Sequence, residues 1–265
     1  MTNKSPSPFV SPASPLRFAS LLCDLALAWR LLTIIPLPFI PDEVHPAPGR
    51  AAAFFPLIGL ALGVILAGLS WLLALILPSG LTAALLLAAW AGLTGLLHLD
   101  GFIDCCDGLL PPRDPARRLE IMKDSRVGAF GVVGVVVLLL VKFNALAALP
   151  DLYRSLVLIV TPVLARWAMV WAMVRYPLAR TEGLSVLFKT GLGWRQVILA
   201  SVVALGVSLL LGWRGLVLLA ASWLVATLIA RLAMARLGGL TGDVYGAIGE
   251  LVESVLLVMA IFVSI

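Results

Sequence analysis

Three aspartates in one short stretch are the residues of this sequence best suited to chemistry. Asp100, Asp104 and Asp107 stand at positions i, i+4 and i+7 of HLDGFIDCCDGLL. On a continuous helix they share a wedge of about 60° on one face, at about 100° per residue. Three like charges held so close repel one another, and a bare helix would gain by losing them. The spacing therefore predicts a bound cation.

An all-oxygen ligand set favours a hard divalent ion. Mg²⁺ in particular takes one or two carboxylates together with the phosphates of a substrate. Gly101 and Gly108 leave room beside the aspartates for a phosphate or another helix to approach closely. The alternative is a solvated acidic helix end, but such an end needs no single face. We therefore expect Asp100, Asp104 and Asp107 to be magnesium ligands and catalytic residues.

A basic motif, MKDSRVGAFG, follows directly before an apolar stretch and contains Lys123, Asp124 and Arg126. Free N–H groups and the helix dipole favour an anion at a helix N-terminus, so cations followed by glycines suit a phosphate. A basic cluster beside a membrane span is also ordinary on topological grounds. We interpret these three residues as candidate substrate-binding residues. His98 is a further candidate, as an acid, a base or a phosphate ligand, although a lone histidine is more often structural.

A second acidic stretch lies near the C-terminus, in GGLTGDVYGAIGELVESV. Asp243, Gly246, Glu250 and Glu253 fall within about 80° on one helical face. An ionised carboxylate inside an apolar segment costs several kcal/mol unless it is paired or hydrated, so such residues are functional candidates. We expect Asp243 and Glu250 to bind substrate. The alternative is a structural ion pair with an arginine such as Arg166.

The fold that positions these motifs must have lipid as its main solvent. Of the 265 residues 62% are hydrophobic and 12% charged, which is more apolar side chain than a soluble domain of this size could bury. Only helices and closed barrels satisfy every backbone group in hydrocarbon, and the apolar runs here are continuous rather than alternating. The composition predicts an all-α, polytopic integral membrane helix bundle.

Seven apolar stretches are long enough to span a hydrocarbon core, which takes about 20 residues. An earlier segment, 18–35, carries Asp24 and Arg30 and runs into Pro36 and Pro38, so we expect an interfacial or re-entrant helix, with an eighth span as the alternative. The Pro- and Ser-rich residues 1–17 predict a disordered leader, and 18–265 a single membrane catalytic domain. The seven predicted spans are 51–77, 81–97, 128–149, 155–174, 196–211, 216–230 and 247–265.

Lysine and arginine predict the orientation. The basic segments precede the first span and follow the second, fourth and sixth, so seven spans bring them to one side, which the positive-inside rule makes cytoplasmic. The acidic motifs share that side, so we expect the active site to face the cytoplasm. The same rule accounts for the net charge of +5, and we expect a lipid bilayer and no nucleic acid as partner. The cysteines have neither metal-ligand nor disulfide spacing and are interpreted as small fillers.

Four motifs together resemble one family. FFPLIG at 54–59, HLDGFIDCCDG at 98–108, MKDSRVGAFG at 122–131 and GGLTGDVYGA with GELVE at 238–253 are similar to those of the cobalamin synthases, or adenosylcobinamide-GDP ribazoletransferases. The resemblance covers nearly the whole chain. It implies a bacterial inner-membrane, Mg²⁺-dependent enzyme that joins adenosylcobinamide-GDP and α-ribazole, or its 5′-phosphate, to give adenosylcobalamin, or its 5′-phosphate, and GMP. It also implies association with other cobamide-pathway enzymes.

The resemblance implies roles for individual residues as well. Asp100, Asp104 and Asp107 would hold the metal against the pyrophosphate, Lys123 and Arg126 would stabilise phosphates, and Asp243 and Glu250 would hold a second ion or orient the nucleophile. Two departures stand out. Cys105 and Cys106 replace the family's small or hydroxyl residues, and LARTEGLS at 178–185 replaces an Arg-Pro before a Gly-Leu-Gly loop. The second departure leaves a substrate role for Arg180 or Glu182 in doubt.

Two other readings compete with this one. CDP-alcohol phosphotransferases and prenyltransferases also use helical aspartates at a membrane face. The former should show D-G-x-x-A-R followed by G-x-x-x-D-x-x-x-D, whereas Asp100-Gly101 is followed here by Phe-Ile-Asp-Cys. A secondary transporter would place its carboxylates near the bilayer midplane, often between sequence repeats. The carboxylates here gather at one interface and no repeat is visible, so both readings rank below metal-assisted phosphoryl transfer.

Overall fold

The computed structural model describes residues 15–37 and 47–263. The predicted leader lies outside these residues except for 15–17, which are helical rather than disordered and begin the first helix. Within the described ranges the chain is helical, apart from connections and one isolated parallel bridge. The elements are α1 (Pro15–Leu32), η1 (Pro48–Phe54), α2 (Phe55–Ala74), α3 (Ser79–Leu93), α4 (Leu97–Leu109), α5 (Pro115–Ile121), α6 (Ala129–Ala148), α7 (Asp151–Arg175), α8 (Leu184–Leu187), α9 (Trp194–Ser208), η2 (Leu209–Leu211), α10 (Trp213–Leu237) and α11 (Gly242–Val263).

The predicted membrane helix bundle is confirmed. Six of the described helical segments are long and apolar enough to cross a membrane, and the bent pair of α3 and α4 makes a seventh if it counts as one span. Each of the seven predicted apolar stretches falls on one of these segments. Helix α1 is not among them, and its buried Asp24 forms an ion pair, at 2.9 Å, with the more exposed Arg50 of η1.

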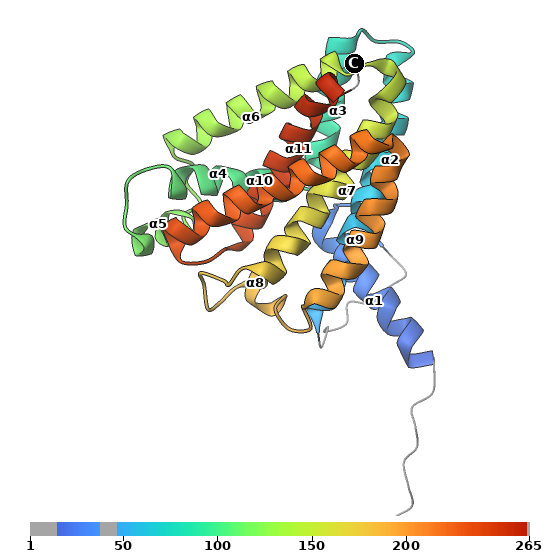
Figure 1. Ribbon diagram of the computed structural model, residues 1–265. Coiled ribbons are helices and arrows are strands. Elements are labelled where there is room, and N and C mark those ends of the chain that lie inside the picture. Colours follow the sequence, from blue (N-terminus) through green and yellow to red (C-terminus); the bar gives the residue numbers. More distant parts are fainter. Residues whose placement is uncertain (1–14, 38–46, 264–265) are drawn as a thin grey trace, which may run out of the picture.

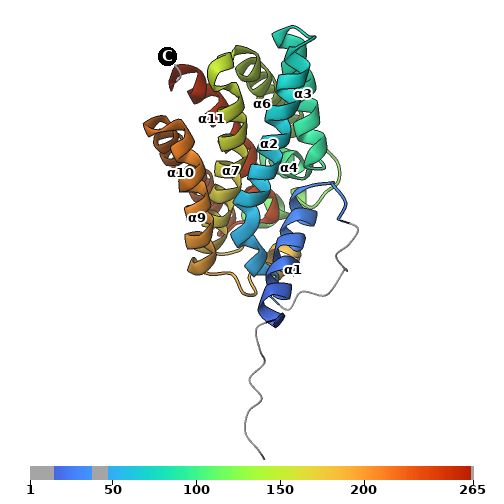
Figure 2. The ribbon, with the colours of Figure 1, turned by 90° about the vertical axis from the view of Figure 1, so that its right-hand side faces the viewer.

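Helices α7 and α11 form the centre of the bundle, as Figure 2 shows for α7. In their most apolar stretches 83% and 72% of residues are buried, against 28–39% in the four other long helices. Glycines on α2 make the closest approach to α7: a Cβ on Gly63 would lie 2.6 Å from the Cα of Ile159. Small residues of this kind let helix backbones pack tightly where lipid offers no hydrophobic driving force.

The second predicted span does not run straight into the acidic motif. Helix α3 ends at Leu93, and α4 leaves it at an angle of 90°. The turn is a Schellman motif, because the N–H groups of Gly95 and Leu96 bond the carbonyls of Gly92 and Ala91. Gly95 and Leu96 both have positive φ, at 61° and 60°. The expectation of one continuous helix is therefore wrong, although the aspartates still share the separate helix α4.

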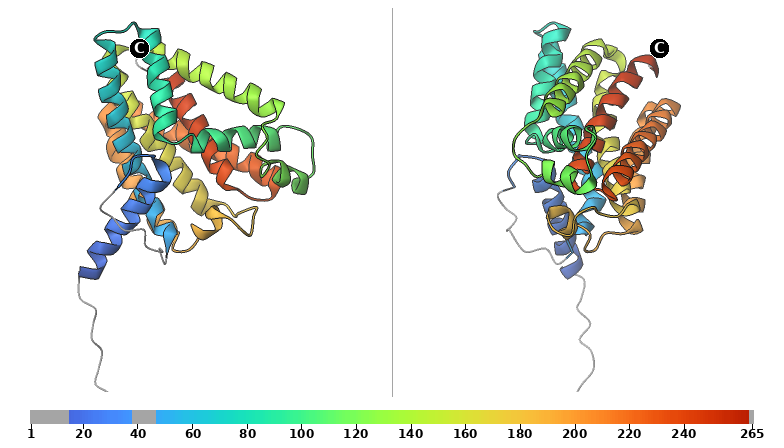
Figure 3. Two further views of the ribbon diagram at one scale, coloured as in Figure 1. Left: turned by 180° about the vertical axis from the view of Figure 1, so that it is seen from behind. Right: turned by 90° about the vertical axis from the view of Figure 1, so that its left-hand side faces the viewer.

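The connections divide between the two ends of the bundle. Figure 1 shows α5, α8 and the α10–α11 connection on one side, with the α2–α3 connection and the C-terminal end of α11 on the other. The view from behind in Figure 3 agrees. The first group includes connections whose lysine and arginine residues led us to predict that they share one side of the membrane. Helix α4 lies at that end, so its aspartates share it.

Candidate active site

Helices α4 and α11 approach closely where the two acidic motifs meet. A Cβ on Gly101 would lie 2.8 Å from the carbonyl oxygen of Asp243, and one on Gly246 would lie 3.0 Å from the carbonyl oxygen of His98. Only glycine permits such an approach. Gly101 therefore makes room for a helix rather than for a phosphate. The contact places the side chains of Asp100 and Asp104 beside the first turn of α11.

The first turn of α11 is held by Thr241. Its hydroxyl oxygen accepts a hydrogen bond from the N–H of Val244, as an N-cap does, and its proton is donated to Asp243. An aspartate in the first turn also suits the helix dipole. Asp243 is thereby oriented before any ligand binds.

A loop that the sequence left in doubt completes the site. Leu178 and Leu240 form a parallel β-bridge in which the N–H of Ala179 donates to Leu240 at 2.8 Å. The bridge carries Arg180 to α11, where its Nη1 lies 3.3 Å from Oδ2 of Asp243. Arg180 is therefore part of the site.

The far end of this loop is tied back to α7. Lys189 donates to the carbonyls of Met173 and Tyr176, at 2.6 and 3.1 Å, and so satisfies the end of the helix. Partial burial lowers the pKa of Lys189. Both ends of the connection between α7 and α9 are thus fixed, which limits where Arg180 can move.

The result is a cluster of three carboxylates around one guanidinium, which we name the acidic cluster: Asp100, Asp104, Asp243 and Arg180. Asp104 is half-buried and interacts electrostatically with Asp243 and Asp100, and favourably with Arg180. Two nitrogens of Arg180, Nε and Nη2, are buried and have no hydrogen-bond partner in the described part of the chain. The cluster has more negative charge than it can neutralise, together with spare donors that an anion could use.

Asp107 does not join this cluster, contrary to the predicted triad. Its carboxylate accepts hydrogen bonds from the N–H groups of Gly128 and Gly131, at 2.7 and 2.8 Å. It therefore caps the N-terminus of α6, where free N–H groups and the dipole favour an anion. The sequence rightly predicted an anion at this helix start, but the anion is Asp107 rather than a substrate phosphate.

The basic motif lies at the surface. Lys123 is exposed, and Arg126 is 88% exposed and bonded through its guanidinium to Asp124. That arginine and its backbone N–H hold the pKa of Asp124 down to about 2. None of the three is among the described residues that line the pocket beside the acidic cluster. Their role in substrate binding stays a prediction.

Glu250 and Glu253 belong to a different structure, which we name the buried ion network: Lys142, Arg166, Glu250 and Glu253. Lys142 donates to Glu250 at 2.5 Å and to Glu253 at 2.7 Å, and Arg166 donates to Glu253. All four side chains are at least nine-tenths buried. The alternative of an ion pair with Arg166 is confirmed, and Glu250 is bound to Lys142 instead of facing the pocket.

A pocket of about 290 Å³ opens beside the acidic cluster. Asp100, Asp243, Arg180 and Glu182 line it, and so does His98 at the start of α4. His98 is 3% exposed, and its Nε2 has no hydrogen-bond partner in the described ranges. The structure thus brings His98, Asp100 and Asp243 of the predicted site residues to one cavity.

Three important residues were missed or left undecided by sequence reasoning. Arg180 and Glu182 reach the pocket through the 178–185 loop, whose polar sequence after an apolar span was the available signal. Lys142 was overlooked inside a predicted span, although a lone lysine there needs a partner. Its partners Glu250 and Glu253 lie on the last helix, and no local pattern points to them.

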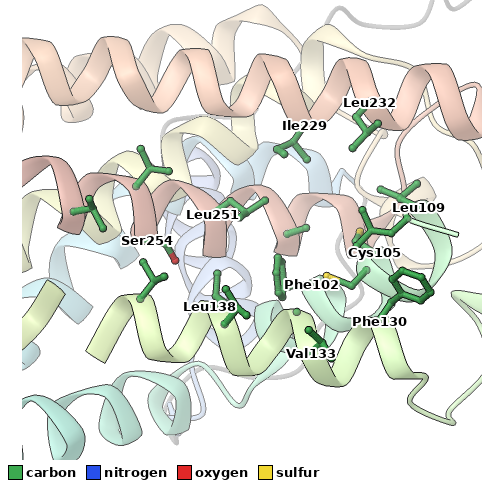
Figure 4. A pocket seen from close by; sticks show the side chains of 18 of the residues that line it. Phe102, Cys105, Leu109, Phe130, Val133, Leu138, Ile229, Leu232, Leu251 and Ser254 are labelled. Carbon is green, nitrogen blue, oxygen red and sulfur yellow. The ribbon is translucent and has the colours of Figure 1, made fainter. Parts of the chain in front are cut away.

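A second, larger cavity of about 860 Å³ lies between α4, α6, α10 and α11. Figure 4 shows Leu138, Ile229 and Leu251 projecting around it from three of these helices. Cys105 and Cys106 line it as buried free thiols, as expected of small fillers. The same helix therefore turns Asp100 toward one cavity and its cysteines toward another.

Comparison with known proteins gives a consistent result. The sequence profile of the cobalamin-5-phosphate synthase family matches residues 24–261. A protein of Geotalea daltonii is 43% identical over 229 residues, which is 86% of this chain and 92% of that protein. A protein of Roseiflexus sp. (strain RS-1) is 40% identical over 231 residues, 87% of this chain and 86% of that one. Both are named adenosylcobinamide-GDP ribazoletransferase. No solved structure matches the chain.

Proposed function

The chain belongs to the cobalamin-5-phosphate synthase family, and from this premise we propose that it is a membrane transferase joining adenosylcobinamide-GDP to α-ribazole or its 5′-phosphate. The observation that carries the proposal is the acidic cluster at the mouth of the pocket. Carboxylates beside an arginine with free donors are what phosphoryl transfer from a diphosphate donor, with a nucleoside monophosphate as leaving group, requires.

The proposed reaction breaks the phosphoanhydride of the donor and forms a phosphodiester with the acceptor. A ribose hydroxyl of the acceptor attacks the phosphorus next to cobinamide, and a new P–O bond forms. The bond between that phosphorus and the bridging oxygen breaks, and GMP leaves with the electron pair. The proton of the attacking hydroxyl is released to water. The product is adenosylcobalamin, or its 5′-phosphate when the acceptor carries one, because the 5′ position takes no part.

We propose Mg²⁺ as the cofactor, held by carboxylates of the acidic cluster. The donor set fits, because Asp100, Asp104 and Asp243 offer only oxygen, the ligand that hard divalent ions prefer. Among the described residues no three acidic, histidine or cysteine side chains are already gathered as a complete ligand set. That agrees with a magnesium ion that takes one or two carboxylates and completes its shell with substrate phosphates. When bound, the ion would neutralise charge on the diphosphate.

The side chains of this chain would do the positioning. Arg180 would exchange part of its contact with Asp243 for the diphosphate, using the Nε and Nη2 donors that are free now. Its two anchored loop ends limit the entropy lost in that exchange. Thr241 would keep Asp243 in its present rotamer while Arg180 moves.

We also propose that the protein lies in the bacterial inner membrane with this site facing the cytoplasm. Support comes from the basic connections, which gather at the end of the bundle where α4 and the start of α11 lie (Figure 1). Lysine and arginine in such short loops stay on the cytoplasmic side.

The test uses detergent-purified enzyme with adenosylcobinamide-GDP and α-ribazole, with and without Mg²⁺, and scores the products by chromatography. We expect cobalamin and GMP in equal amounts, and only with the metal. A second reaction with α-ribazole 5′-phosphate shows which acceptor has the higher kcat/KM. Folded enzyme with intact substrates that forms no product would overturn the proposal and point to diphosphate-alcohol lipid substrates.

A further inference from the structure

The interior of the pocket differs chemically from its mouth. Asp100, Asp243 and Arg180 line its more exposed part, which we call the mouth, whereas the more buried walls are apolar and come from four separate parts of the chain. Phe55, Met169, Met173 and Phe188 are all at most 8% exposed. A molecule that fills this pocket must therefore have an apolar part inside and a polar part at the opening. The walls are Leu31, Leu32, Phe55, Met169, Met173 and Phe188.

Two neutral polar groups interrupt the apolar interior. Nε2 of His98 and the hydroxyl of Tyr245 belong to side chains that line the pocket and are only 3% and 5% exposed. Neither atom has a hydrogen-bond partner in the described part of the chain. A buried polar group without a partner is unfavourable, so a ligand that bonds to these atoms gains affinity. Neutral donors and acceptors suit ring nitrogens and hydroxyls better than a charged group.

The size of the pocket selects between the two substrates. Its volume of about 290 Å³ lies just below the range of about 300–1,000 Å³ for small-molecule sites. That is enough for one nucleoside and far too little for a corrin ring with its nucleotide. The guanine end of the donor also fits poorly, because its edge of donors and acceptors would face apolar walls and stay unpaired.

The base of α-ribazole has the complementary character. A dimethylbenzimidazole is flat, largely apolar and carries few polar atoms, so thioether and aromatic side chains pack well against it. We propose that this pocket is the acceptor site, with the base between Met169, Met173 and Phe188 and the ribose toward the acidic cluster. His98 and Tyr245 are then acceptor-binding residues. The assignment rests on the proposed function and adds which substrate enters the pocket and in which direction.

This orientation explains why the acidic cluster sits at the mouth. The ribose hydroxyl meets the donor's phosphate beside Asp100 and Arg180, and the bulky corrinoid stays outside the bundle. Met169 and Met173 limit how large a base can enter. Base selectivity is then set by packing on α7.

The test measures the KM of each substrate separately while the other is saturating. Met173→Phe should raise the KM for α-ribazole at least about tenfold, because an overfilled apolar pocket discriminates by that order. The KM for adenosylcobinamide-GDP should stay within about twofold. Met259→Phe is the matched control, since Met259 lines the other, larger cavity, and it should change neither value.

Two further variants make a side chain smaller, so their effects cannot come from the overpacking that Met173→Phe introduces. Tyr245→Phe should raise the KM for α-ribazole about fivefold, the value of one ordinary hydrogen bond. Met173→Ala should accept nucleosides with bulkier bases that the wild type rejects. An unchanged KM for α-ribazole in both, or a rise confined to adenosylcobinamide-GDP, would overturn the acceptor assignment. Wild-type enzyme in the same assay separates the two proposals, because absence of any product overturns the proposed function itself.

Discussion

Helix α11 carries two groups of acidic residues, one at a pocket and one buried in the core. Asp243, in its first turn, joins Asp100 and Asp104 at a pocket mouth with Arg180 as the cation the structure places among them. Glu250 and Glu253, two to three turns further on, are buried with Lys142 and Arg166. The first group has three carboxylates for one cation, and the second has two for two. Acidic residues on one helix can therefore serve different purposes.

The difference in charge balance indicates what each group does. A buried carboxylate must be paired, so the ion network balances its own charge without a ligand and holds α6, α7 and α11 together. The acidic cluster, by contrast, has two more carboxylates than cations, and like charges this close repel and need a further cation. The excess negative charge of the acidic cluster indicates a role in binding or catalysis. The balanced charge of the buried ion network indicates a role in holding the helices together.

The largest effect expected is on turnover, from Asp104→Asn. The variant keeps the size of the side chain but removes its charge from the acidic cluster, and kcat should fall at least about 1,000-fold. Yield and thermal stability in detergent should be unchanged. Asp151→Asn is the matched control, because the side chain of Asp151 is 96% exposed at the start of α7 and does not line the pocket. Normal turnover of a folded Asp104→Asn protein would remove the argument for this cluster.

Lys142→Met tests whether the buried ion network has a structural role. It leaves Glu250 and Glu253 with Arg166 alone, and breaking a buried ion pair costs about 3–5 kcal/mol. We expect a large drop in the unfolding temperature in detergent, while the KM values of any surviving enzyme stay normal. Adding Glu250→Gln should restore part of the stability, since the remaining charges then balance. A stable Lys142→Met protein with altered KM would show that the network belongs to the active site after all.

Arg180→Ala removes the single cation of the acidic cluster. Loss of hydrogen bonds to a charged group costs about 1.5–3 kcal/mol, so kcat/KM for adenosylcobinamide-GDP should fall about 10- to 100-fold. Arg126→Ala should have less than a twofold effect, because exposed ion pairs contribute about 0.2–1 kcal/mol. Equal losses in the two variants would favour the phosphate role that the sequence predicted for the basic motif.

Asp107→Asn should have the smallest effect of the four. One carboxylate oxygen becomes an amide that cannot accept from α6, and loss of an N-cap bond costs about 1–2 kcal/mol. Thermal unfolding in detergent measures that loss. The Mg²⁺ concentration for half-maximal activity should not change. A clear increase in that concentration would support the predicted triad over the capping role.

The sequence by itself determined the fold class, the spans and the end of the bundle where the site lies. These properties depend on local composition, because an apolar run of about 20 residues must cross lipid as a helix. It also predicted Asp100, Asp104 and Asp243 as site residues, since charge beside a span is costly wherever the helix packs, and the structure brings these three together. The bend after α3 was missed, although Gly95 at the end of that helix was an available signal.

Only the tertiary structure decided which charges meet. Asp107 binds N–H groups that lie 21 and 24 residues further along the chain, and Lys142 binds Glu250 across 108 residues. Arg180 reaches Asp243 because a β-bridge joins two distant connections. A helical wheel shows which residues share a face but not what that face contacts. Packing between segments far apart in sequence decides which group each carboxylate contacts. That contact in turn decides whether the carboxylate caps a helix, forms a buried ion pair or belongs to the candidate active site.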